Sequence, residues 1–236
     1  MPRGAAAKPG KTPALASPPA DDTARHAQGL AISTEITSWW HEARGTSAMQ
    51  IKPKDVIDVL NKAGVRFVLM GAHAMAGWLK GEARATLDVD VLIRKQHHKK
   101  AVAAISAAFP SLIAEENPVV TRFRDPALDV VVIDLMKPSH DIHAAVFENT
   151  VSGGKSHDIP SLEMALASKF AAMMSPNRQQ PRKLTDAGDF GNMTLANRDK
   201  IDREKLHSLG ELVYPGGGVD IIAMMDDFLQ GRPIKL

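Results

Sequence analysis

The chain has 236 residues, and its 29 Lys and Arg residues nearly balance its 27 Asp and Glu residues, giving a formal net charge of +2. With 44% hydrophobic and 24% charged residues, the composition is globular and excludes a wholly disordered or collagen-like protein. The sequence contains no cysteine, which excludes disulfides, thiolate zinc sites and a cysteine nucleophile. No apolar run approaches the roughly 18 residues of a spanning helix, and a chain without thiols fits the cytoplasm.

Residues 1–49 are predicted to form a disordered or semi-ordered leader. The first 20 residues are rich in Ala, Pro and Gly and contain no acidic residue, as is typical of a solvated tail. Their prolines would also disrupt the amphipathic helix of a transit peptide. The region 24–49 is expected to be semi-ordered.

Residues 50–155 are predicted to form a core of alternating helices and strands. A proline at a first helical position, Pro53, and apolar residues at helical spacing predict a helix that ends at Gly64. The other elements expected in the core are strands at 65–70, 87–93, 119–123 and 128–136, and helices at 72–79 and 96–109.

The pattern changes in residues 156–236, which are predicted to form a helical C-terminal subdomain. Apolar residues recur there at helical rather than alternating spacing. The expected helices span residues 162–174, 184–195, 202–212 and 219–229.

The most informative chemistry lies in residues 71–93, which run from the end of the expected strand at 65–70 through the expected strand at 87–93. In a strand at 87–93, Asp88 and Asp90 project to one face, about 7 Å apart. Such a pair can hold Mg²⁺ together with substrate phosphates, and the repulsion between the two acids implies a cation. Upstream, a strand leads into Gly71 at a helix start, whose free N–H groups suit a phosphate. These features predict a site for a nucleoside triphosphate and its metal.

This order of motifs resembles the nucleotidyltransferase superfamily, which has the polymerase-beta-like fold, and most closely its branch of AbiEii-like toxins from type IV toxin–antitoxin systems. The resemblance covers roughly residues 56–193 and implies an α+β fold, with a small mixed sheet flanked by helices and a helical C-terminal layer. The residues that carry it are, in order, Gly71, Ala72, Ala74, Arg84, Thr86, Asp88 and Asp90.

The resemblance implies a role for several side chains. Asp134, at the end of an apolar strand, is the third carboxylate; it would complete a Mg²⁺ or Mn²⁺ site with Asp88 and Asp90 and help to deprotonate the attacking hydroxyl. Asp129, five residues earlier, faces the opposite way. The implied nucleotide-binding residues are Gly71, Ala72, His73, Arg84, Thr86, Lys169 and Lys183. Among them, Lys169 would face the triphosphate, and Lys183 would border the cleft.

The implied activity is transfer of a nucleoside monophosphate from an NTP to a hydroxyl of an RNA, such as tRNA, or of a protein. A toxin of this kind would also have a cognate antitoxin as partner. The alternative is a catalytically inactive module of the same fold that binds RNA or a partner protein. This alternative is motivated by Ala72, where relatives have Gly or Ser, and by the basic loop 178–183. Two further alternatives stay open: Arg84 pairs with an acid instead of a phosphate, and Asp88 and Asp90 are solvent-facing residues of an edge strand.

Overall fold

A computed structural model describes residues 21–46, 50–80 and 83–234 of the chain. Its strands form one seven-stranded sheet in the order β3-β4-β5-β2-β1-β7-β6. Strand β2 is parallel to β5 and β1 is parallel to β7, whereas the other neighbours are antiparallel. The strands are β1 (Phe67–Leu69), β2 (Val89–Ile93), β3 (Ile113–Glu116), β4 (Val120–Asp125), β5 (Val130–Met136), β6 (Thr150–Ser152) and β7 (Asp158–Pro160).

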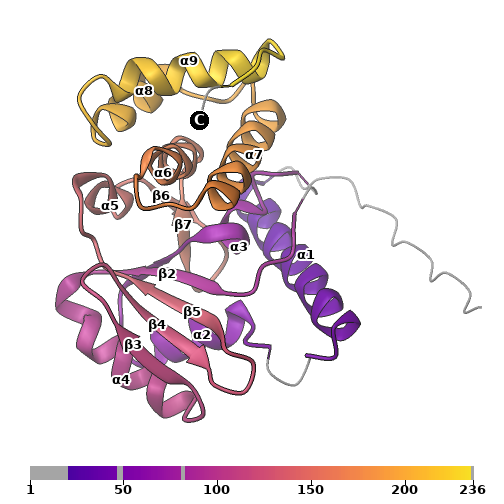
Figure 1. Cartoon of the computed structure of the whole chain (residues 1–236), viewed down its shortest axis with the longest axis vertical. Helices are drawn as coiled ribbons and strands as arrows, with labels where there is room; N and C mark the ends of the chain where they lie inside the picture. Colours follow the sequence, from indigo (N-terminus) through magenta and orange to yellow (C-terminus); the bar gives the residue numbers. More distant parts are fainter. Residues whose placement is uncertain (1–20, 47–49, 81–82, 235–236) are drawn as a thin grey trace, which may run out of the picture.

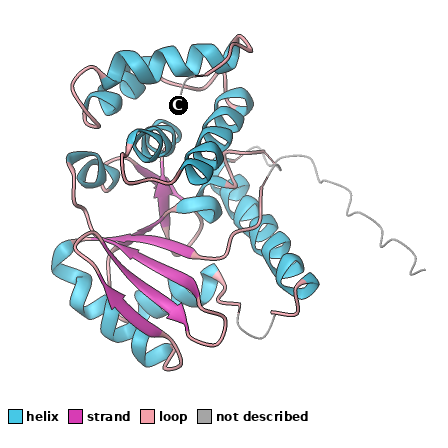
Figure 2. Cartoon of the chain, viewed as in Figure 1, coloured by secondary structure: helices cyan, strands magenta, loops and turns pink. Residues whose placement is uncertain are grey.

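Helices lie on both sides of this sheet, and the C-terminal helices form a layer of their own at the top of the view (Figures 1 and 2). None of the described helices has the length and apolar composition needed to cross a membrane. The helices are α1 (Asp22–Ala43), α2 (Pro53–Lys62), α3 (Gly71–Met75), a short 3-10 helix (Lys95–His97), α4 (His98–Ala108), α5 (Asp141–Val146), α6 (Leu162–Met174), α7 (Gln180–Ala196), α8 (Arg203–Glu211) and α9 (Gly217–Leu229).

The alternation of side chains divides the core between the two faces of the sheet. Phe67 and Val91 point toward α2 and α4 and belong to one buried cluster. Leu92, the neighbour of Val91, belongs to a second cluster, which the C-terminal helices dominate. The predicted mixed sheet with flanking helices and a helical C-terminal layer is therefore confirmed. Asp90, two residues before Leu92 in β2, is on the same face of the sheet as Leu92.

The structure differs from the sequence-based expectation near the N-terminus. Residues Asp22–Ala43, expected to be only semi-ordered, form a helix of 22 residues that the Asp21 side chain caps by accepting a hydrogen bond from the Thr23 N–H. The rest of the expected leader, residues 1–20 and 47–49, lies outside the described residues. Strand β7 lies after residue 155, in the part predicted to be a helical subdomain, but it pairs with β1 of the predicted core. The division into domains at residues 49 and 155 stays a prediction.

Candidate functional site

Three aspartates meet where the parallel strands β2 and β5 lie side by side. Asp90 lies in β2 and is directly opposite Asp134 of β5 in the strand register, and Asp88 lies just before β2. One carboxylate oxygen of each residue lies within 4.8 Å of the corresponding oxygens of the other two. Strand β2 is an interior strand of the sheet, which excludes the edge-strand interpretation of this pair. The three predicted carboxylates therefore form one cluster, called the acid triad below.

Burial and the charges of neighbouring carboxylates disfavour ionisation of two members of the triad, Asp90 and Asp134. Burial, followed by the charges of Asp88 and Asp134, raises the pKa of Asp90 well above its usual range. Burial and the charge of Asp88 raise the pKa of Asp134 to about 6, against the opposing effect of Arg122. The Asp134 Oδ1 atom is buried and has no hydrogen-bond partner among the described residues, and Arg122 Nε lies 3.8 Å from it.

A divalent cation would satisfy these groups. A buried carboxylate oxygen without a partner is costly, and metal coordination supplies the missing interaction. An all-oxygen donor set of this kind is one that Mg²⁺ or Mn²⁺ prefers. Asp88, Asp90 and Asp134 thus fit the hard cation that the sequence predicts.

Gly71 allows the turn after β1 to pass directly against the triad. Its φ is +65°, in the left-handed region, and a Cβ added to it would lie 1.9 Å from Asp90 Oδ2. Only glycine meets both requirements without displacing a neighbour. The N–H of Met70, the preceding residue, donates to the Asp90 carbonyl at 2.8 Å, so the turn and the acidic strand are tied together.

The two residues after Gly71 face the protein interior. Ala72 is buried, and the ring of His73, only 3% exposed, has its Nδ1 atom 2.9 Å from Ser33 Oγ of α1. Burial lowers the pKa of His73 to about 4, so its ring is neutral at pH 7. In this structure His73 therefore connects α3 to α1, and its role toward a nucleotide stays a prediction.

Thr86 links the triad to the same N-terminal helix. Its hydroxyl donates to Asp88 Oδ1 at 2.7 Å, and its backbone N–H donates to Thr37 Oγ1 of α1 at 3.3 Å. Helix α1 thus helps to hold one of the triad carboxylates in place. The sequence singled out Thr86 but gave no indication of Thr37.

The predicted basic residues have different surroundings. Lys169 of α6 is buried and lies 2.8 Å from Asp186 Oδ1 and 2.7 Å from Asp189 Oδ2 of α7. Arg84 pairs with Asp189 through two hydrogen bonds of 3.0 and 3.1 Å. The acid partner that the sequence allowed for Arg84 is thus 105 residues away. Lys183 is partly exposed on α7 and has no ion pair among the described residues.

Sequence reasoning missed two arginines beside the triad. Arg122 of β4 is directly opposite Asp134 in the sheet, and the alternation of β4 could have placed it on that face. Arg178 precedes α7 and donates from Nε to Asp186 Oδ2 at 2.9 Å. The sequence placed Arg178 in a basic loop without assigning it a partner. Both cations favour ionised Asp134.

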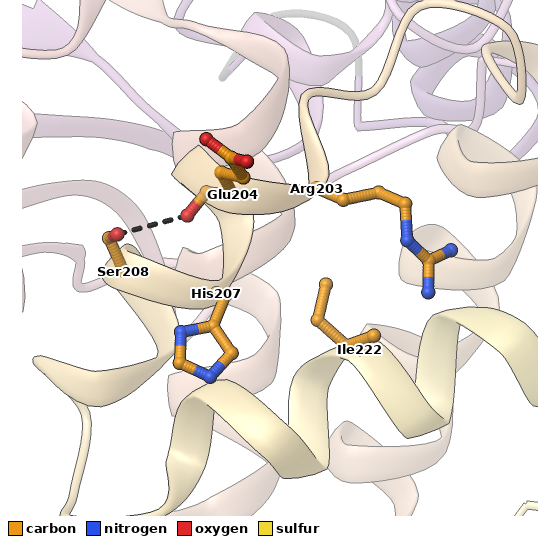
Figure 3. Close-up of a pocket in the computed structure, with 5 residues that line it drawn as sticks. All are labelled: Arg203, Glu204, His207, Ser208 and Ile222. Carbon is orange, nitrogen blue, oxygen red and sulfur yellow. Dashed lines mark hydrogen bonds between the residues drawn. The ribbon is translucent and has the colours of Figure 1, made fainter.

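A separate surface pocket of about 380 Å³ lies between α8 and α9 (Figure 3). Its side chains are Arg203, Glu204, His207, Ser208 and Ile222, none of which the sequence predicts to be functional. The Ser208 hydroxyl donates to the Glu204 carbonyl at 2.9 Å, a bond within the helix. This pocket and the acid triad have no residue in common.

Comparison with known proteins gives weak similarities of fold. No family model and no curated protein matches the chain. Among solved structures, an antigenic nucleotidyltransferase-like protein from Paracoccidioides brasiliensis is 18% identical with a TM-score of 0.40, covering 72% of this chain and 88% of that chain. The antibiotic-resistance factor ANT(2'')-Ia is 13% identical with a TM-score of 0.48, covering 76% and 95%.

Terminal uridylyl transferase 4 from Trypanosoma brucei, with bound GTP, is also similar. It is 13% identical with a TM-score of 0.31, and the match covers 89% of this chain and 72% of that one. At these identities and TM-scores, the similarities do not decide the function, which has to be argued from the residues of the site.

Proposed function

We propose that the chain is a nucleotidyltransferase that depends on Mg²⁺ or Mn²⁺ and transfers a nucleoside monophosphate from an NTP to a hydroxyl of an RNA or a protein. The observation that carries the proposal is the acid triad, with oxygens within 4.8 Å of one another and a buried Asp134 Oδ1 that accepts no hydrogen bond from the described residues. The glycine turn against Asp90 and the arginines around the triad support it, because an NTP brings several phosphate charges to the site.

Each part of the triad has a task in this proposal. Asp88, Asp90 and Asp134 would hold the cation, which when bound stabilises the charge on the attacking and leaving oxygens. Asp134, which lies directly opposite Asp90 in the sheet, would accept the proton of the acceptor hydroxyl. The hydroxyl oxygen then forms a bond to the α-phosphorus, the bond from that phosphorus to the bridging oxygen breaks, and pyrophosphate leaves.

The test is transfer of label from each of the four α-labelled NTPs to RNA or to the protein itself. We expect transfer by the wild type with Mg²⁺ or Mn²⁺ and a loss of at least about 100-fold in Asp90→Asn. Asp129→Asn is the matched control, because Asp129 lies next to β5 but its side chain is 90% exposed and pairs with Arg124. No transfer by the wild type, or equal transfer by Asp90→Asn, would refute the proposal.

The toxin role is part of the same proposal and rests on the resemblance of the sequence motifs. Expression in a bacterial host should arrest growth, and Asp90→Asn should abolish the arrest if nucleotidyl transfer causes it. Co-expression of a small protein encoded by a neighbouring reading frame should relieve the arrest if that protein is the antitoxin. An equally toxic Asp90→Asn variant would contradict a catalytic toxin and favour the binding-module alternative.

A further inference from the structure

A continuous set of ion pairs connects three elements beside the acid triad. Lys169 of α6 binds Asp186 and Asp189 of α7 at the same time. Asp189 in turn binds Arg84 before β2, and Asp186 binds Arg178 before α7. These five residues, called the ion-pair chain below, contain three positive and two negative charges.

The interior and the ends of the ion-pair chain differ in exposure. The side chains of Lys169, Asp186 and Asp189 are at most 8% exposed, whereas those of Arg84 and Arg178 are 38% and 40% exposed. The ammonium group of Lys169 is thus enclosed by two carboxylates. The two guanidinium groups remain open to a ligand.

Each guanidinium group is held from one side. Arg84 uses Nε and Nη2 for Asp189, and its Nη1 also donates to the Ala85 carbonyl at 3.3 Å. Arg178 uses Nε and Nη2 for Asp186. Because a guanidinium has five N–H donors in a rigid plane, the remaining donors keep a fixed direction. Arg84 lies two residues before Thr86, whose hydroxyl donates to Asp88 of the triad at 2.7 Å. Arg178 is joined to Arg84 through Asp186, Lys169 and Asp189.

We propose that Lys169, Asp186 and Asp189 are positioning residues that orient Arg84 and Arg178 to bind the phosphates of the NTP. This inference rests on the proposed function and assigns Lys169 a role other than direct contact with the triphosphate. The excess positive charge of the ion-pair chain lies at its open ends, beside the carboxylates that would hold the cation. A phosphate group is the ligand that two preoriented guanidinium groups recognise best.

The test is a double-mutant cycle on the binding of a fluorescent ATP analogue with Mg²⁺ to the full chain. Arg84→Gln should raise the Kd about tenfold or more, the usual effect of losing a charged hydrogen bond. Asp189→Asn should raise it similarly, and the double variant should bind no more weakly than Arg84→Gln alone, because Asp189 acts through Arg84. Asp226→Asn is the matched control. Asp226 of α9 also accepts two hydrogen bonds from a single arginine, Arg203, at 2.7 and 2.9 Å, and the substitution breaks that pair.

Several outcomes would overturn the inference. Arg84 is partly exposed, so Arg84→Gln should fold, and unchanged binding by this variant would refute it even if Asp189→Asn fails to fold. Additive effects in the cycle would show that Asp189 acts independently of Arg84. Lys169→Gln abolishing binding while Arg84→Gln leaves it unchanged would identify Lys169 as a direct ligand. If the wild type binds the nucleotide, these outcomes overturn the inference and leave the proposed function intact. If the wild type binds no nucleotide, the inference and the proposed function are both refuted.

Discussion

Replacing Gly71 with alanine perturbs the site by one methyl group of known position. The left-handed φ of +65° at Gly71 costs an L residue roughly 1–2 kcal/mol. The new Cβ would lie 1.9 Å from Asp90 Oδ2, whereas ordinary contacts begin at 3.4 Å, so the carboxylate must move by about 1.5 Å. Because a misplacement of about 1 Å at a reacting centre costs about 100-fold, we expect nucleotidyl transfer to fall by about 100-fold or more.

The assay compares labelled-NTP transfer with the free energy of unfolding in urea. Gly231→Ala is the matched control, because Gly231 also has a φ of +65° but a Cβ there would meet nothing within 4 Å. This control should lose at most a similar roughly 1–2 kcal/mol of stability and keep its activity. The reasoning would be refuted if Gly71→Ala kept wild-type transfer activity. It would also be refuted if Gly71→Ala and Gly231→Ala lost equal activity, because the contact with Asp90 would then not be the cause of the loss.

Three further predictions concern charge, pH and the support of the triad. Lys169→Met leaves two buried carboxylates without their shared cation and should lower the free energy of unfolding by roughly 3–5 kcal/mol, whereas Lys54→Met, which removes an exposed ion pair, should barely change the melting temperature. The pKa of Asp134 is raised from 3.8 to about 6; its protonated form therefore stabilises the folded state below pH 3.8, and this contribution is lost as the pH rises through 6. In EDTA, the wild type should thus lose stability relative to Asp134→Asn over this range, and parallel curves would contradict the prediction. Thr86→Val removes the hydroxyl that donates to Asp88 and should weaken metal-dependent transfer by about 10- to 100-fold; unchanged transfer would show that Asp88 needs no such support.

A local rule predicts two members of the acid triad, Asp88 and Asp90, whereas the prediction of Asp134 came from the resemblance to the nucleotidyltransferase superfamily. Alternation in a strand puts Asp88 and Asp90 on one face, and the parallel pairing of β2 with β5 brings Asp134 opposite Asp90. The partners of Lys169 were beyond such rules. Its ion pairs join two helices that only the tertiary fold brings together, and Asp189 also binds Arg84 from 105 residues away.

Helix α1 was missed because its buried face is not apolar. The residues that it buries recur at helical spacing but are small or polar: Arg25, His26, Gly29, Ser33, Thr37 and His41. Apolar periodicity, the main sequence signal of an amphipathic helix, is therefore missing. Close backbone packing replaces it, since a Cβ added to Gly29 would lie 2.4 Å from the Gly77 nitrogen.

The short strands were missed for a different reason. Strands β6 and β7 have three residues each, too few for an alternating pattern to be recognised. Strand β3, at one edge of the sheet, is largely exposed and has no apolar face to predict it. Strand β7 forms by pairing with β1, which is distant in sequence, whereas β6 pairs with β7 and β3 pairs with β4.

The central claim is that the acid triad holds a divalent cation for an NTP, and the most direct test is Mn²⁺ binding followed by electron paramagnetic resonance in the presence of ATP. We predict that the wild type binds Mn²⁺ and that Asp88→Asn, Asp90→Asn and Asp134→Asn each weaken binding by about tenfold or more, whereas Asp129→Asn binds as the wild type does. Equal Mn²⁺ affinity in the wild type and the three triad variants would contradict the claim.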